Sequence, residues 1–109
     1  MSVGPLLQVT TTTPTEELAQ RIAEVTVAER LAACAQVYGP IASTFHWRGA
    51  VDRATEWCCV LKTTSERYPA LEARIRTLHP YEVPEILATL VEGSEAYLRW
   101  IEREVRSKE

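Results

Sequence analysis

Few side chains in this sequence have the chemistry to bind a soft metal or act as nucleophiles. Copper-type metals prefer thiolate and imidazole donors, and the 109 residues contain three cysteines and two histidines. Cys58 and Cys59 are adjacent, so in a strand they would point to opposite faces. The odd number of cysteines argues against a disulfide framework. We therefore interpret Cys34, Cys58 and Cys59 as small buried hydrophobes, because free cysteine is among the most buried residue types.

No familiar catalytic motif is present. The sequence lacks the GxSxG, P-loop, GxGxxG and HExxH patterns. With so few histidines, and cysteines that we expect to be buried, a nucleophile–base pair is hard to assemble. Cys34 with His79 is the one pairing left open. We expect the protein not to be an enzyme.

A stiff segment with two acidic residues is a candidate for ligand binding. Pro80 and Pro84 limit the freedom of the backbone, so Glu82 and Glu85 could both be presented to one cleft. There they would offer oxygen ligands or hydrogen bonds to a small molecule, whereas the alternative is that both are solvated loop carboxylates. Tyr81 is either a phenol that faces this ligand or a packed amphipathic side chain.

Lys62 follows an apolar strand pattern and could hold an anion in a cleft between subunits. The alternative is an intersubunit salt bridge, for which Glu56 is the candidate partner. Aromatic residues are enriched in the cores of interfaces, so Trp47, Trp57 and Trp100 are candidate interface residues together with Glu56. Each of these assignments requires a partner chain.

The strands and helices that position these residues have recognisable boundaries. Residues 6–12 are rich in β-branched side chains and predict a strand. Thr13 as N-cap, Pro14 at the first helical position and Glu16 two residues later form a capping-box pattern. We therefore expect a helix that runs to about Arg30.

A long hairpin is predicted over residues 32–64. Proline cannot donate a ladder hydrogen bond, so Gly39 and Pro40 predict a bulge or kink in its first strand. Gly49 tolerates positive φ and marks the turn. Residues 57–61 are apolar on both alternating faces, which is typical of a central strand that is covered on both sides.

The second half of the chain repeats the pattern of helix and strand. Ser65 is expected to cap a helix with Pro69 in its first turn. That helix should end at His79, since a residue before proline disfavours helical backbone. A strand over residues 86–91 and a helix capped by Ser94 complete the chain. Basic residues near the end of this helix suit its dipole, namely Arg103, Arg106 and Lys108.

The element order predicts an α+β, ferredoxin-like split βαβ fold, βαββαβ plus a C-terminal helix. We expect an antiparallel or mixed sheet with the first two helices on one face. Trp57 or Cys58, whichever points away from these helices, must then find cover. Burial is worth roughly 25 cal/mol per Å², and one C-terminal helix is too small to cover the whole face. Association of sheets from several copies is therefore expected.

Composition and charge indicate one globular domain over residues 1–109, with residues 1–5 flexible. Hydrophobic residues make up 46% and charged residues 25%, and the net charge is −3. No cluster of lysine and arginine suggests nucleic-acid binding. No apolar run approaches the ~20 residues that span a bilayer, and no signal peptide is evident. We therefore expect no nucleic-acid or membrane partner, and a cytoplasmic location.

Several short runs of the sequence are distinctive. The most specific is His-Pro-Tyr-Glu-Val-Pro-Glu-Ile at residues 79–86. The others are Glu-Arg-Leu-Ala-Ala-Cys at 29–34, Trp-Arg-Gly at 47–49, Lys-Thr at 62–63 and Tyr-Leu-Arg-Trp at 97–100. Together they resemble the CutA family, the divalent-cation tolerance proteins, from about Leu6 to about Trp100.

This resemblance implies a ferredoxin-like fold assembled as a tight homotrimer, in which strands extend across subunits. The fold of the family is similar to that of the nitrogen-regulatory PII signalling proteins. The resemblance implies a cytosolic, non-catalytic protein of divalent-cation and especially copper tolerance, with weak metal binding. The alternative is a PII-like signalling or scaffold trimer that binds a small anionic metabolite or a partner protein between subunits. A third reading is a purely structural trimer.

The resemblance also implies a position for copper. The site proposed for some members uses a cysteine near the end of the first strand and two histidines before Pro-Tyr. These positions correspond to Thr11, Leu78 and His79, so only His79 keeps a donor and is the candidate metal ligand. The alternative for His79 is a helix C-cap whose ring satisfies last-turn carbonyls. His46 is interpreted as an exposed strand residue.

Overall fold

The computed structural model describes residues 5–106, which form four strands and three helices. The predicted flexibility of residues 1–5 falls, apart from Pro5, outside the described residues, and so does Lys108. In chain order the elements are β1 (Leu6–Thr13), α1 (Glu16–Ala28), β2 (Cys34–Trp47), β3 (Ala50–Thr64), α2 (Tyr68–Leu78), β4 (Ile86–Leu90) and α3 (Glu95–Glu104). The sheet order is β2-β3-β1-β4, with every neighbouring pair antiparallel. The predicted ferredoxin-like α+β order is confirmed.

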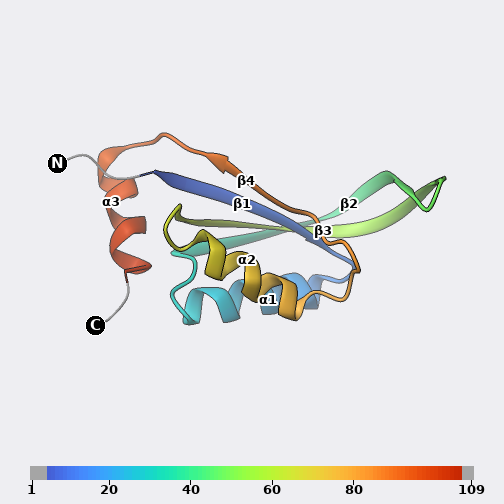
Figure 1. Ribbon diagram of the computed structural model, residues 1–109, viewed down its shortest axis with the longest axis horizontal. Coiled ribbons are helices and arrows are strands. Elements are labelled where there is room, and N and C mark those ends of the chain that lie inside the picture. Colours follow the sequence, from blue (N-terminus) through green and yellow to red (C-terminus); the bar gives the residue numbers. More distant parts are fainter. Residues whose placement is uncertain (1–4, 107–109) are drawn as a thin grey trace.

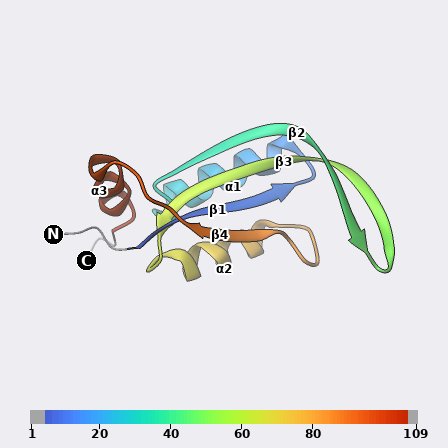
Figure 2. The ribbon, with the colours of Figure 1, turned by 90° about the horizontal axis from the view of Figure 1, so that it is seen from above.

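The helices are distributed unevenly around the sheet. α1 and α2 lie side by side on one face, and α3 lies at the end of the sheet where β1 begins (Figure 1). Within the described residues, no helix lies over the opposite face, which we call the open face. The hairpin of β2 and β3 extends well beyond the ends of β1 and β4 (Figure 2). None of the helices in residues 5–106 is long and apolar enough to cross a membrane.

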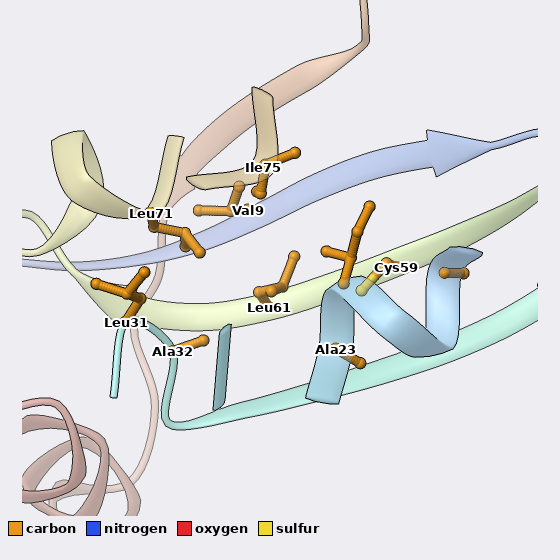
Figure 3. Packing of buried hydrophobic residues seen from close by; sticks show 10 residues of the cluster. Val9, Ala23, Leu31, Ala32, Cys59, Leu61, Leu71 and Ile75 are labelled. Atoms are coloured by element: carbon orange, nitrogen blue, oxygen red, sulfur yellow. The ribbon is translucent and has the colours of Figure 1, made fainter. Parts of the chain in front are cut away.

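The main core lies between the sheet and the first two helices. Val9 of β1 and Leu61 of β3 are fully buried against Leu71 and Ile75 of α2 and Ile22 of α1. Figure 3 shows the side chains of Leu71 and Ile75 directed at Val9. Each such side chain contributes about 1.5–3 kcal/mol by its burial. This core holds the sheet rigid behind the open face.

Strand pairing displaces the start of α1 from its predicted position. Thr13 still pairs with Trp57 as the last residue of β1, so it is part of the ladder and not the N-cap. Thr15 takes this role, and its hydroxyl accepts a hydrogen bond from the backbone N–H of Leu18 at 3.1 Å. The helix ends at Ala28, close to the predicted end.

The same effect moves the start of α2. The N–H of Ser65 donates to the carbonyl of Pro5 at 3.1 Å, which continues the pairing of β1 and β3. Ser65 is therefore not the cap, and the helix begins at Tyr68, with Pro69 in its first turn as predicted. The predicted end at His79 and the Ser94 cap of α3 are both confirmed.

The hairpin has the predicted irregularity and turn. The register of β2 against β3 shifts between Tyr38 and Ile41, and Arg48 and Gly49 have φ of 52° and 82° at the two-residue turn. Because β1 ends opposite Trp57, the segment from Ile41 to Glu56 has no strand partner outside the hairpin itself in the described residues. We call this segment the projecting hairpin.

From the sequence we predicted that one face of the sheet would be covered by other copies of the chain. The open face is that surface. Trp57 packs on the main core, so by strand alternation Cys58 and Val60 point to the open face. Both are already buried within this chain, so Cys58 itself does not need cover from another copy. On this face Leu87 is 61% exposed and Tyr38 54% exposed. α3 instead packs a small separate cluster at the end of the sheet, which contains Leu6, Ala33, Ile101 and Val105. The helices of this chain thus leave apolar sheet surface uncovered.

Candidate functional site

His79 stands at the junction of α2 and the proline-containing segment, and its ring is held at both nitrogens. The residue is 8% exposed. Its Nε2 lies 2.6 Å from the carbonyl oxygen of Thr12, and its Nδ1 accepts a hydrogen bond from the N–H of Tyr81 at 3.2 Å. Since a carbonyl can only accept and an N–H can only donate, the ring is neutral with its hydrogen on Nε2. A metal ion at either nitrogen would have to displace one of these bonds.

The ring of His79 binds a carbonyl of β1, and not a carbonyl in the last turn of α2 as the C-cap alternative predicted. β1 pairs with β4 only as far as Thr11 opposite Ile86, so Thr12 lies just beyond the end of that ladder. A buried carbonyl left without a partner would be costly. His79 satisfies this strand carbonyl, whereas the alternative reading placed its ring on the last turn of the helix.

Tyr81 connects the same segment to β3. Its hydroxyl donates to Oε2 of Glu56 at 2.8 Å, and its ring centroid lies 4.7 Å from that of His79. Burial, followed by the hydrogen bond to Glu56, raises the pKa of Tyr81 to about 12. Tyr81 is therefore an uncharged donor at neutral pH, and within one chain its hydroxyl is already engaged.

Glu56 and Lys62 are not partners within this chain. Glu56 is 6% exposed and accepts from Tyr81, while the ammonium of Lys62 donates to Oε1 of Gln36. Lys62 lies six positions after Glu56 along β3, which is about 20 Å. A cleft that contains both Lys62 and Tyr81 would have to draw them from different subunits, so the intersubunit salt bridge stays a prediction.

The two loop glutamates are exposed and do not converge with Lys62. Oε1 of Glu82 lies 3.3 Å from the guanidinium of Arg48 at the hairpin turn, and both side chains are at least 68% exposed. An exposed ion pair of this kind contributes little stability. Glu85 is also exposed. Both remain available to a ligand or a second chain.

The three tryptophans occupy three different environments. Trp47 is 39% exposed near the hairpin turn, with the guanidinium carbon of Arg48 5.4 Å from its ring centroid. Trp57 packs on the main core, and Trp100 packs on the α3 cluster and stacks on Tyr97 at 5.6 Å. Trp47 is thus the most available for an interface.

The cysteines of this chain do not come together as a metal site. Cys58 and Cys59 are buried as predicted, whereas Cys34 is only partly buried, with Sγ 3.3 Å from the Tyr97 hydroxyl. No group of three or more His, Cys, Asp or Glu side chains in residues 5–106 is arranged to hold a metal ion. Cys34 lies opposite Lys62, near α3, so the Cys34–His79 pairing is not formed.

Three features of this region were missed by sequence reasoning. The hydrogen bond between Tyr81 and Glu56 was not predicted, although an acid next to the apolar run that begins at Trp57 was a signal of burial. The hydroxyl of Thr11, at the position implied for a metal-binding cysteine, is fully buried without a hydrogen-bond partner in the structure. No local signal marked Thr12 as the partner of His79.

Comparison with known proteins extends over nearly the whole chain. The model of the family described as CutA1 divalent ion tolerance protein matches residues 7–104. The divalent-cation tolerance protein CutA of Thermus thermophilus is 43% identical over 91 residues, which cover 83% of this chain and 88% of that protein. Protein CutA of Mus musculus is 39% identical over 88% of this chain, which spans only 55% of the mouse protein.

Solved structures agree in fold. CutA1 of Oryza sativa superposes with a TM-score of 0.92 at 30% identity, covering 99% of this chain and 100% of that chain. The Thermus thermophilus protein gives 0.89 at 40% identity, with 91% and 97% covered. CutA of Archaeoglobus fulgidus, described as periplasmic, gives 0.89 at 33% identity, with 93% and 99% covered.

Proposed function

Because the chain belongs to the CutA1 divalent ion tolerance family, we propose that it acts as a homotrimer that binds divalent cations weakly. In this proposal the trimer contributes to metal tolerance, with copper as the main cation, and catalyses no reaction. Nucleic acid and membranes are not among its partners. The observation that carries the proposal is the open face, which one subunit leaves uncovered next to a projecting hairpin.

Assembly is supported by the shape and chemistry of the subunit. The open face carries the exposed side chains of Leu87 and Tyr38, and the projecting hairpin exposes Phe45, Trp47 and Val51. Exposed apolar patches are typical of association sites. Closed symmetry would also satisfy the free edges of β2 and β4 without open-ended pairing.

The proposal that cation binding is weak is supported by the state of His79. Imidazole is a good copper ligand, but both ring nitrogens are hydrogen-bonded within the chain. An ion at His79 must therefore displace Thr12 or Tyr81, which lowers its net affinity. Further ligands would come from a neighbouring subunit, for which the exposed Glu82 and Glu85 are available.

Copper titration by calorimetry tests the cation proposal. We expect the purified, tag-free protein to bind copper with a heat that His79→Ala removes. His46→Ala is the matched control, because His46 is the other imidazole and is exposed on the hairpin. An unchanged heat in His79→Ala would contradict a role for His79, and sedimentation of a stable monomer would contradict the trimer.

A cytoplasmic location is supported by the free thiols. Cys34, Cys58 and Cys59 are all unpaired in the structure, and free cysteines are typical of reducing compartments. Fractionation of the producing cells, followed by immunodetection, tests this part. Recovery in an extracytoplasmic fraction, as the description of the Archaeoglobus relative suggests for that protein, would overturn it.

One observation favours the second candidate, a PII-like trimer that binds a small anionic metabolite. Lys62 is partly buried, and its ammonium is hydrogen-bonded to the neutral amide of Gln36. None of the ion pairs found in residues 5–106 includes Lys62. A partly desolvated ammonium without a carboxylate favours an anion, from a metabolite or from a second chain.

Thermal shift with a panel of nucleotides, phosphate and carboxylic acids tests this candidate. A ligand that binds the native state raises the melting temperature, by an amount that grows with the logarithm of its concentration relative to its Kd. We expect Lys62→Gln to abolish any such shift, with the charge-conserving variant Lys62→Arg retaining it. A shift that Lys62→Gln leaves unchanged would exclude this site.

A further inference from the structure

The projecting hairpin needs support that its own two strands do not provide. A two-stranded hairpin is marginally stable in water, and two-stranded ribbons twist more than wider sheets. From Ile41 to Glu56 the described structure offers β2 and β3 only each other as strand partners. The direction in which this segment leaves the sheet must therefore be set at its base.

The base of the hairpin is held from the helix side by Trp57. A Cβ added at Gly39 would lie 2.6 Å from Cδ1 of Trp57, so the indole rests directly on the irregular part of β2. This contact fixes one side of the hairpin base. By strand alternation the neighbouring residue, Glu56, points to the other side.

On that other side, a chain of three hydrogen bonds joins the hairpin base to the rigid sheet. Nε2 of His79 donates to the carbonyl of Thr12, the N–H of Tyr81 donates to Nδ1 of His79, and the hydroxyl of Tyr81 donates to Glu56. Glu56 lies opposite Ile41, the first pair of β2 and β3 beyond the register shift. The chain of bonds thus ends where the hairpin begins.

Burial strengthens the hydrogen bonds of His79, Tyr81 and Glu56. His79 and Glu56 are 8% and 6% exposed, and a hydrogen bond to a buried carboxylate is worth more than one between neutral groups. A second contact between this segment and the hairpin, Glu82 with Arg48, is exposed and weak. The direction of the hairpin therefore depends on its base rather than on its tip.

We propose that His79, Tyr81 and Glu56 form a lock that sets the direction of the projecting hairpin and thereby holds it ready for assembly. The three are positioning residues, and the proposal rests on the trimer proposed above. It gives the His-Pro-Tyr run a role in assembly that is independent of any metal. It also accounts for a carboxylate buried at the point where β1 ends.

Removing the Tyr81 hydroxyl is the direct test. Tyr81→Phe keeps the ring but leaves the buried carboxylate of Glu56 without its donor. We expect subunits of Tyr81→Phe to exchange between labelled and unlabelled trimers about 10-fold faster than wild type, which corresponds to about 1.4 kcal/mol. Tyr97→Phe is the matched control, because it removes a hydroxyl that contacts Cys34 at the start of β2, away from the projecting hairpin.

Amide hydrogen exchange separates a lock from a general loss of stability. In Tyr81→Phe, we expect faster exchange of amides in residues 41–56, while amides of the main core around Val9 and Leu61 exchange as in wild type. Uniformly faster exchange throughout the chain would overturn the proposal. The proposal would also be overturned if Tyr81→Phe matched wild type both in hydrogen exchange of the projecting hairpin and in the rate of subunit exchange.

A double-mutant cycle separates the loss of the Tyr81–Glu56 hydrogen bond from misfolding of a single variant. Glu56→Leu removes the acceptor, and replacing both partners of a buried hydrogen bond costs less than removing one. Tyr81→Phe combined with Glu56→Leu should therefore exchange subunits no faster than the worse single variant. Strictly additive effects would contradict the lock.

The lock and the trimer can fail separately. If wild type assembles and Tyr81→Phe exchanges subunits at the same rate, the lock is wrong and the trimer stands. If wild type sediments as a monomer, the trimer is wrong, and hydrogen exchange of the hairpin in that monomer still decides the lock. Faster hairpin exchange in Tyr81→Phe would then support it, and unchanged exchange would overturn it.

Discussion

The indole of Trp57 occupies the space that any side chain at position 39 would need, since a Cβ at Gly39 would lie 2.6 Å from its Cδ1. We expect Gly39→Ala to lower the free energy of unfolding by about 1–3 kcal/mol through overpacking. Urea denaturation measures this difference. Gly93→Ala is the control, because its Cβ would meet only Leu98 at 3.6 Å, an ordinary contact. An equal loss in both variants would contradict the steric explanation.

The buried hydroxyl of Thr11 predicts a stabilising substitution. It has no hydrogen-bond partner in the structure, so Thr11→Val should raise the free energy of unfolding by about 1–2 kcal/mol. Thr63 is equally buried, but its hydroxyl donates to the carbonyl of Leu31 at 2.7 Å. Thr63→Val should therefore be destabilising. Thermal or urea unfolding of both variants checks whether stability changes in opposite directions. A loss of stability in Thr11→Val would contradict this explanation.

Cys59 predicts a loss of stability in alkali. Burial, and secondly the charge of Cys58, raise the pKa of Cys59 from 9.0 to about 12. The unfolded chain therefore releases this proton at lower pH than the native chain. The contribution of Cys59 to the free energy of unfolding is complete below pH 9 and is lost as the pH rises towards 12. Measured by urea unfolding between pH 8 and pH 12, the free energy of unfolding should fall less steeply for Cys59→Val than for wild type. Parallel curves would show that Cys59 does not titrate as predicted.

Arg30 connects the ends of three helices. It has a φ of 59°, its carbonyl accepts from the guanidinium of Arg67, and its own guanidinium donates to the carbonyl of Glu104 at 2.8 Å. Arg30→Gly removes the side chain but suits the backbone, whereas Arg30→Ala also strains it. We expect Ala to be less stable than Gly by about 1 kcal/mol. Both variants should loosen α3, measured by hydrogen exchange of its amides.

Local signals explain which parts of the fold were predictable. Pro40 cannot donate to a ladder and Gly49 tolerates positive φ, so the irregularity and the turn of the hairpin follow from single residues. The predicted caps Thr13 and Ser65 were wrong, because pairing of β1 with β3 extends over both ends of the strands. A ladder partner from elsewhere in the chain outweighed a favourable local capping pattern.

The sequence by itself determined the element order, the central position of β3 and the excess of apolar sheet surface, because periodicity and turn residues act over short distances. Only the tertiary structure decided how the candidate site is used. Its contacts join residue 12, residue 56 and residues 79–81, which folding brings together from three separate segments. Whether an imidazole or a carboxylate is free depends on the partner that lies beside it when water is excluded, and composition and spacing do not contain that information.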